Sequence, residues 1–357
     1  MQTSRDFLRD FGIDFPIIQA PMAGGLSTPE LAAAVCNAGA LGSLGAGYLT
    51  PDQIRYEFGR FRALTDKPVA INLFAGGYET GRVVDARPML EILARIHEEL
   101  GLPAPALPAV APNAFPKQLE TVLALRPEIF SFTFGVPATD EMKRLKERGI
   151  FTMGTATTVD EARALEAAGT DAIVAQGSEA GAHRGTFLRG FEESMVPIRE
   201  LVPAIRKATS LPVIASGGLM DGRDIAEMIS LGACAAQLGT AFLTCPEAGT
   251  PEAYRQAILS ARSDTTVITR AFSGRAARGL RNAFIEKLHG KEGYILPFSL
   301  QNSLTRPMRT AAAKKGDAGY LSLWAGQGVT RARVLPAAGL IRQLAAEMNN
   351  AQAARHS

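Results

Sequence analysis

One pattern of apolar and polar positions recurs along the first 245 residues. A segment with apolar residues at helical spacing ends in glycine, and a short apolar run follows, as in MKRLKERGIFTMGTA (142–156) and IAEMISLGACAAQLGT (225–240). The glycine is typical of a helix C-cap in the left-handed conformation, and the apolar run is typical of a strand buried on both faces. Strands that alternate with helices at this spacing predict βαβ units and a parallel sheet.

Eight of these runs are predicted strands. They cover residues 16–22, 40–46, 69–75, 129–135, 150–156, 172–177, 212–218 and 235–243. Eight strands with helices between most of them predict an α/β fold, a (β/α)8 TIM barrel of about 250 residues. The alternative is an open doubly wound sheet, for which GALGSLGAG (39–47) offers a glycine fingerprint. Those glycines run through the predicted strand instead of joining its end to a helix, so the barrel is favoured.

Two stretches depart from the repeat. Residues 76–128 are too long for one crossover; they hold an amphipathic helix and then five prolines between Pro103 and Pro116, which indicate an extended segment at the rim. After Cys245 the repeat stops. We therefore expect a barrel over residues 1–250, an additional, mainly helical substrate or lid domain over 251–335, and a C-terminal helix and tail over 336–357 that packs on the barrel.

Composition narrows the class of protein. The 357 residues are 46% apolar and 20% charged, as in globular chains, and no apolar run is long enough to span a membrane. The three cysteines lack C-x-x-C spacing and lie in apolar stretches, which predicts buried free thiols and a cytoplasmic location. The four histidines show no metal-ligand spacing, so no metal site is expected.

The charge is divided unevenly along the chain. Residues 1–250 hold 22 Lys and Arg against 29 Asp and Glu, whereas residues 251–357 hold 16 against 6. The basic residues are spread singly and without interleaved aromatics, which argues against a nucleic-acid face. Either the basic segment offers cations to a small anionic ligand, or it is simply a solvated surface.

Glycines gather where the predicted strands end. In a barrel the carboxyl ends of all strands face the active site, and the loops after strands seven and eight commonly grip a phosphate. Here those loops are SGGLMDG (216–222) and QLGT (237–240), each expected to open a helix whose N-terminus favours an anion. The alternative is that these glycines only cap helices and turns.

The other strand ends carry neutral groups. Met22, Asn72 and Gln176 offer apolar surface and amides, which suit a flat heterocycle with polar edges, such as the flavin of FMN. Only Glu179 and His183, both after the sixth strand, are titratable there.

Several of these motifs carry a family resemblance. PIIQAPMAGG (16–25), GSEAGAHRG (177–185), PVIASGGLMDGRDI (212–225) and QLGTAFLTCPE (237–247) resemble the class I nitronate monooxygenases, and SGRAARGLRN (273–282) and WAGQG (324–328) extend the match over nearly the whole chain. The resemblance implies an FMN-dependent enzyme that uses O2 to oxidise alkyl nitronates, notably propionate 3-nitronate, to an aldehyde or ketone plus nitrite. Its partners would then be a small anionic nitronate and O2, with no nucleic acid and no membrane, in a monomer or homodimer.

The resemblance also implies roles for individual residues. Ala20, Pro21 and Met22 would lie against the flavin, with Asn72 and Gln176 at its polar edges. The phosphate and ribityl chain would be held by Gly181, Gly217, Gly218, Gln237, Leu238, Gly239 and Thr240.

His183 is also a candidate on its own chemistry, because it is the only histidine at a predicted strand end. A neutral imidazole could take the α-proton of a nitroalkane, and a protonated one could bind the anionic nitronate. The alternative is a histidine that only structures its loop.

Arginines of the basic segment are candidates for the substrate carboxylate, since a guanidinium binds a carboxylate well. Arg306, in LTRPMR (304–309), is the first choice among Arg275, Arg278, Arg281, Arg306 and Arg309. Some family members carry tyrosines and a lysine in this region, whereas LPFSLQNSLTRPM (296–308) has neither, which leaves the substrate preference open.

Two other functions remain open at this point. One is an FMN-dependent NAD(P)H:quinone or enoyl-thioester reductase on the same barrel. The other is a sugar-phosphate lyase or a binding protein without flavin.

Overall fold

A single sheet of eight parallel strands forms the centre of the molecule. The computed structural model describes residues 6–77, 85–109, 112–263 and 265–356. The strands are β1 (Ile17–Gln19), β2 (Gly42–Gly45), β3 (Val69–Phe74), β4 (Ile129–Thr133), β5 (Phe151–Ala156), β6 (Ala172–Gln176), β8 (Val213–Ser216) and β9 (Ala235–Leu238). They lie in the order β1-β9-β8-β6-β5-β4-β3-β2. All eight predicted strands are present.

The first and last strands of this order also meet. The backbone N–H of Gln19 donates to the carbonyl of Leu41 at 2.8 Å, and the N–H of Leu41 donates to the carbonyl of Ile17 at 3.0 Å. This contact closes the sheet, so the predicted TIM barrel is confirmed and the open doubly wound sheet is wrong. The glycine pattern of β2 serves packing instead, because a Cβ on Gly42 would lie 2.3 Å from the carbonyl oxygen of Ala32 on the neighbouring helix.

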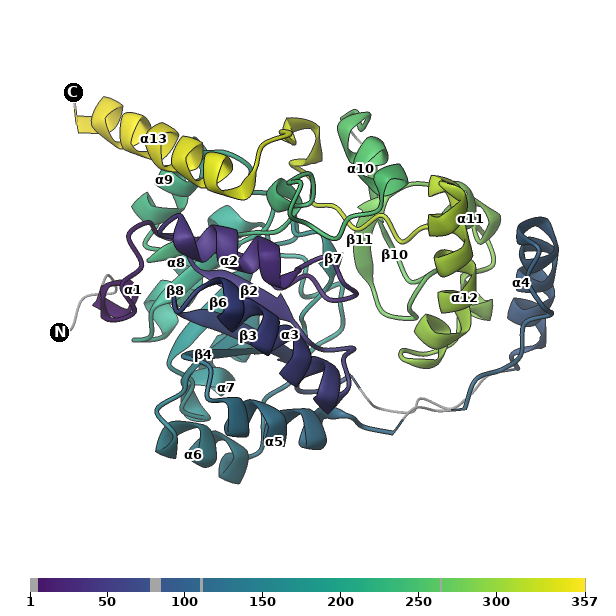
Figure 1. Cartoon of the computed structure of the whole chain (residues 1–357), viewed down its shortest axis with the longest axis horizontal. Helices are drawn as coiled ribbons and strands as arrows, with labels where there is room; N and C mark the ends of the chain where they lie inside the picture. The colour runs from purple at the N-terminus through teal and green to yellow at the C-terminus, as the bar shows by residue number, and fades with distance from the viewer. Residues whose placement is uncertain (1–5, 78–84, 110–111, 264, 357) are drawn as a thin grey trace.

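Helices surround the barrel (Figure 1). They are α1 (Asp6–Asp10), α2 (Pro29–Asn37), α3 (Pro51–Leu64), α5 (Phe115–Leu125), α6 (Thr139–Glu147), α7 (Val159–Ala167), α8 (Ile198–Ala208), α9 (Gly222–Ser230) and α13 (Ala337–His356). The expected C-terminal helix is α13, which packs against α9 and α2. Within the described ranges, no helix has the length and apolar character needed to cross a membrane.

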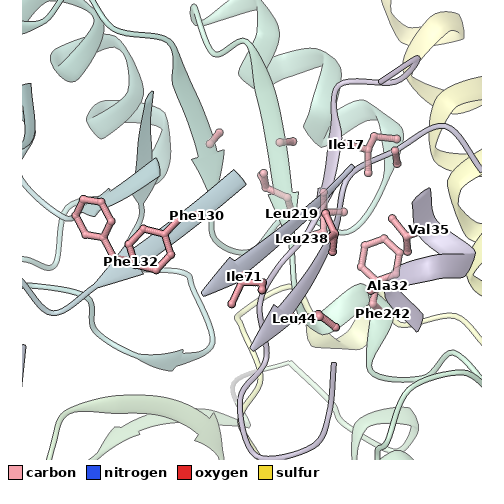
Figure 2. Close-up of a cluster of buried hydrophobic side chains, with 14 of the residues drawn as sticks. Ile17, Ala32, Val35, Leu44, Ile71, Phe130, Phe132, Leu219, Leu238 and Phe242 are labelled. Carbon is pink, nitrogen blue, oxygen red and sulfur yellow. The ribbon is translucent and has the colours of Figure 1, made fainter. Parts of the chain in front are cut away.

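Alternate residues of each strand build two different layers. One set, which includes Ile17, Ile71 and Phe130, packs outward against the helices, as Figure 2 shows. The other set, which includes Ile18 and Ile214, fills the barrel interior under α1. Toward the carboxyl ends the inward positions become mostly polar, and they are Ser43, Asn72, Ser131, Thr155, Gln176, Ser216 and Gln237. The interior is therefore apolar at the bottom and polar where a ligand would lie.

A second unit covers the carboxyl ends of the strands. It consists of α4 (Arg87–Leu100), α10 (Glu252–Leu259), β10 (Thr266–Thr269), β11 (Ala277–Leu280), α11 (Ala283–Lys287), α12 (Leu300–Lys315) and the short 3-10 helices η2 (Glu292–Tyr294), η3 (Ala318–Tyr320) and η4 (Val329–Arg331). Helix α4, from the long segment between β3 and β4, lies beside α12 at the right of Figure 1 and shares this unit's apolar core.

The upper unit also contains strands that the sequence analysis did not predict. Strand β11 pairs antiparallel with β10 and with β7 (Ala182–His183), which belongs to the loop after β6. These strands are two to four residues long, too short to give a period-2 pattern. They join the barrel loop that carries His183 to the upper unit.

Candidate functional site

One cavity of about 690 Å³ lies between the strand ends and the upper unit. All the residues predicted for the site line it: Ala20, Pro21, Met22, Asn72, Gln176, Gly181, His183, Gly217, Gly218, Gln237, Leu238, Gly239, Thr240 and Arg306. The tertiary structure thus brings residues from five strand ends and one distant helix to the same space.

The floor of the cavity is a hydrogen-bonded layer of neutral side chains. Asn72 Nδ2 donates to Ser131 Oγ at 2.9 Å, and Gln237 Nε2 donates to Ser216 Oγ at 3.4 Å. Gln176 holds the loop above it, because its Nε2 donates to the His183 carbonyl at 3.0 Å and its Oε1 accepts from the Gly185 N–H at 2.8 Å. These bonds fix the amides at the edge of the cavity.

His183 is held in the cavity wall by its own strand and by an aromatic cage. Its Nε2 lies 2.8 Å from Ser273 Oγ, and its ring centroid lies 5.4 Å from Trp324 and 5.8 Å from Phe298. Burial, together with the nearby positive charges of Arg275 and Arg309, lowers the pKa of His183 to about 3. The imidazole is therefore neutral at physiological pH.

Two buried charged side chains keep the His183 loop in place. Arg184 donates to the carbonyl oxygens of Gly177 at 2.6 Å and Ser194 at 2.7 Å. Glu161, from the start of α7, accepts from the hydroxyl of Thr186 at 2.7 Å and from the backbone N–H of Phe187 at 2.6 Å. Sequence reasoning did not find Glu161, since nothing in its local pattern distinguishes it from the other acidic residues of a helix start.

A cradle of glycines forms another part of the wall. Gly217 and Gly218 have φ values of +135° and +71°, and a Cβ on Gly218 would lie 2.8 Å from Glu179 Cβ. A Cβ on Gly181 would lie 2.5 Å from the backbone nitrogen of Gly326, which itself donates to Thr240 Oγ1 at 3.0 Å. Backbone groups from three separate loops can approach one another only because side chains are absent.

Neither of the two loops after β8 and β9 opens a helix with a free N-terminus, although both were expected to do so. The Asp221 carboxylate caps α9 and accepts from the N–H groups of Arg223 and Asp224, both at 3.0 Å. The chain after β9 forms only the three-residue helix η1 (Thr240–Phe242). This part of the wall therefore offers the backbone of the glycine turns to a ligand, and not a free helix N-terminus.

Helix α12 lines the opposite wall with one basic face. Its lining residues are Asn302, Arg306, Arg309, Thr310, Ala313 and Lys314. Among the residues that the structure describes, none that lines the cavity carries a carboxylate. The cavity is therefore electropositive, which suits anionic ligands.

The five candidate arginines lie in different surroundings, and only two of them line the cavity. Arg306 and Arg309 line the cavity. Arg278 donates to the Ser178 carbonyl at 3.0 Å, Arg281 pairs with Glu286 at 3.0 Å, and Arg275 donates to the Arg184 carbonyl at 3.1 Å.

Further lining residues were not identified from the sequence. They include Tyr48, Phe134, Asn302, Tyr254 and Trp324. The WAGQG motif was the one available signal, because it contains the only tryptophan of the chain. Within the described ranges, no group of three or more His, Cys, Asp or Glu side chains is placed to hold a metal ion, and Cys36, Cys234 and Cys245 are buried free thiols.

Known proteins are similar to this chain in sequence and in fold. Residues 5–347 match the family model described as nitronate monooxygenase. A probable nitronate monooxygenase of Staphylococcus aureus (strain MSSA476) is 42% identical over 338 residues, which cover 94% of this chain and 95% of the relative.

Solved structures agree with this match. The nitroalkane oxidase of Streptomyces ansochromogenes is 40% identical with a TM-score of 0.90, and the match covers 98% of this chain and 99% of that one. FabK of Thermotoga maritima is 27% identical with a TM-score of 0.78, and the match covers 100% and 99% of the two chains. The resemblance drawn from the motifs is thereby confirmed, and the chain belongs to the nitronate monooxygenase family of oxidoreductases.

Proposed function

We propose that this protein is an FMN-dependent monooxygenase that uses O2 to oxidise alkyl nitronates, among them propionate 3-nitronate, to an aldehyde or ketone plus nitrite. The observation that carries the proposal is the cavity, which combines a neutral histidine, a glycine cradle and a basic wall with no lining carboxylate among the described residues. Together these features suit a phosphate-bearing cofactor and an anionic substrate.

The lining residues fit FMN. The turns at Gly181, Gly217 and Gly218 form a cradle that a single Cβ would fill, which suits a phosphate approached by backbone N–H groups. The backbone from Gln237 through Leu238 and Gly239 to Thr240 would border the ribityl chain. FMN, when bound, supplies a ring system that accepts electrons from the nitronate and delivers them to O2.

The ring would lie on the remaining floor residues. Ala20, Pro21 and Met22 offer apolar contact, and the amides of Asn72 and Gln176 lie at the polar edges. Each amide is already fixed by a hydrogen bond, that of Asn72 to Ser131 in the floor and that of Gln176 to the His183 carbonyl in the loop above, so it meets a ligand without reorganising.

His183 acts as the base on a neutral nitroalkane. Ser273 Oγ can donate to the Arg275 carbonyl at 3.1 Å, so that the His183 Nε2–H donates to Ser273 and Nδ1 stays unprotonated. The neighbouring positive charges that lower the pKa of His183 also stabilise the negative charge that develops on the substrate. A nitronate has already lost this proton, so its oxidation does not need His183 as a base.

This assignment also gives roles to the rest of the chain. Arg306 would meet the carboxylate of propionate 3-nitronate. Residues 1–250 would form the barrel that holds the cofactor, residues 251–335 together with α4 the substrate lid, and residues 336–357 a helix that packs on the barrel. Three buried free thiols fit a cytoplasmic enzyme, and the oligomeric state is a monomer or a homodimer.

Anaerobic mixing tests the proposal. The purified protein should show flavin absorbance, and a nitronate added without oxygen should bleach it, whereas NADH should not. Bleaching by NADH alone would instead favour the quinone or enoyl-thioester reductase, and a colourless protein that binds no added FMN would favour a function without flavin.

A further inference from the structure

Two polar atoms of the cavity wall are buried without a hydrogen-bond partner among the described residues. They are the hydroxyl oxygen of Tyr48 and the Nε of Arg309. Tyr48 follows β2 in the barrel, whereas Arg309 lies on α12 of the upper unit, so the two approach the cavity from opposite sides. Buried polar groups are nearly always satisfied in proteins, and two unsatisfied groups in one cavity point to a ligand.

The Arg309 guanidinium is oriented but not neutralised. Its Nη2 donates to the backbone carbonyl of Asn302 at 2.7 Å and to the Asn302 side-chain oxygen at 2.9 Å. These acceptors are uncharged, and none of the described residues that line the cavity has a carboxylate. Burial lowers the pKa of Arg309 to about 10, so the side chain is still a cation at physiological pH.

The Tyr48 hydroxyl is also held as a donor. The Tyr48 ring packs edge-on against Phe74, with centroids 5.0 Å apart. Burial raises the pKa of Tyr48 to about 12, although the nearby charges of Arg309 and Arg306 oppose the rise. At neutral pH both unpartnered atoms are hydrogen-bond donors, so a ligand that satisfies them must supply acceptors and negative charge.

We propose that Tyr48 and Arg309 form a subsite for a second anionic group of the substrate, a carboxylate at the end remote from the nitronate. The inference rests on the proposed function and adds to it the residues that would bind the remote carboxylate inside the cavity. A carboxylate has two oxygen atoms, one for each donor, and the charged donor supplies a strong hydrogen bond.

The subsite shares its cavity with His183, because Tyr48, Arg309 and His183 all line it. Arg306, one turn earlier on α12, is exposed, so it would meet the same carboxylate as the substrate enters. A substrate that occupies both parts of the cavity therefore carries an anion at each end.

Substrate selectivity tests the subsite. The holoenzyme is assayed with propionate 3-nitronate and with propyl-1-nitronate, which has the same carbon chain without the carboxylate. The ratio of kcat/KM for the first substrate to that for the second should fall about 10- to 100-fold in Arg309→Met and about 3- to 10-fold in Tyr48→Phe. The controls Arg281→Met and Tyr56→Phe, both outside the cavity, should leave the ratio unchanged.

Binding of an unreactive probe provides a readout that does not depend on turnover. Succinate has two carboxylates with the spacing of the carboxylate and nitronate of propionate 3-nitronate, and both groups are planar two-oxygen anions. The dissociation constant of succinate for the holoenzyme, measured by calorimetry, should rise in each variant by about the same factor as the kcat/KM ratio falls in that variant. The melting temperature without succinate should stay the same or rise in Tyr48→Phe, because the variant removes an unsatisfied buried hydroxyl.

The possible failures can be told apart. Equal losses on both nitronates, or a succinate affinity that neither variant changes, would overturn the subsite and leave the proposed function standing. Competition by inorganic phosphate instead of succinate, lost in both variants, would overturn the carboxylate assignment. If the wild type turned over neither nitronate, the proposed function would fail, and variant-dependent succinate binding would still establish the subsite.

Discussion

The Nε2 of His183 lies 2.8 Å from the hydroxyl oxygen of Ser273, a residue 90 positions further along the chain. The pairing of β7 with β11 creates this contact, because it places Ala277 directly opposite His183. Ser273 thus fixes the orientation of the imidazole from the upper unit, while the barrel supplies the loop that carries it.

Replacing Ser273 by alanine should lower activity without loss of FMN. The imidazole would lose the partner that orients it and selects its tautomer, and one neutral hydrogen bond corresponds to about a 3- to 10-fold loss in kcat. Steady-state kinetics on nitroethane, with flavin content measured by absorbance, would check this. Ser260→Ala, at the exposed end of α10, removes a comparable hydroxyl far from the cavity and serves as the control. Equal activities of the two variants would rule out the orienting role.

His183→Asn should retain FMN and lose turnover of neutral nitroalkanes. General-base catalysis typically contributes about 10²–10⁴-fold, so kcat/KM for nitroethane should fall within that range. Preformed ethyl nitronate needs no proton abstraction and should lose much less. The comparison of the two substrates is the measurement, and full activity of the variant on neutral nitroethane would disprove the assignment.

Protonation of His183 should make the fold less stable in mild acid. Its pKa is about 3 in the folded protein against 6.5 for the exposed residue, so the unfolded chain binds the extra proton as the pH falls below 6.5. The stability contributed by the neutral buried ring is complete above that pH and is lost toward pH 3. Between pH 6.5 and 5 the wild type should lose about 1–2 kcal/mol more than His183→Asn, measured by urea unfolding. Parallel losses in the two proteins would show that His183 does not have the lowered pKa.

Gly218→Ala should weaken binding of FMN. The added methyl group would lie 2.8 Å from Glu179 Cβ, at a φ of +71°, and would displace the turn that faces the cavity. Gly290→Ala is a matched control, since Gly290 has a φ of +72° and no atom within 4 Å of such a methyl group. We expect the dissociation constant of FMN, measured by fluorescence, to rise at least 10-fold in the first variant only. Unchanged FMN affinity in a folded Gly218→Ala protein would place the phosphate elsewhere.

Arg306→Ala should raise the KM for propionate 3-nitronate and leave that for ethyl nitronate unchanged. The side chain is exposed at the cavity mouth, where solvent weakens its attraction for a carboxylate, so we expect only a two- to five-fold effect. The two Michaelis constants, compared at fixed ionic strength, are the test. An equal loss on both substrates would exclude a carboxylate role for Arg306.

The barrel and the residues at its strand ends that line the cavity could be predicted from the sequence because they depend on local patterns. Apolar runs after glycine-capped helices identify the strands, and the end of each strand identifies the residues that face a TIM-barrel site. For the same reason Met22, Asn72 and Gln176 could be placed on the cavity without knowledge of the packing.

The sequence by itself therefore determined the (β/α)8 architecture and singled out the glycine turns and His183 as candidates, since periodicity and strand ends are properties of short segments. Only the tertiary structure decided which distant residues complete the site. Ser273 meets His183 through the long-range pairing of β7 with β11, and Glu161 holds the His183 loop from α7. Arg309 of α12 lines the same cavity as Tyr48, which follows β2, and such contacts between distant segments leave no local periodic signal. Whether a polar atom is satisfied depends on every neighbour within a few ångströms, and for that reason the unpartnered donors of Tyr48 and Arg309 could be recognised only after folding.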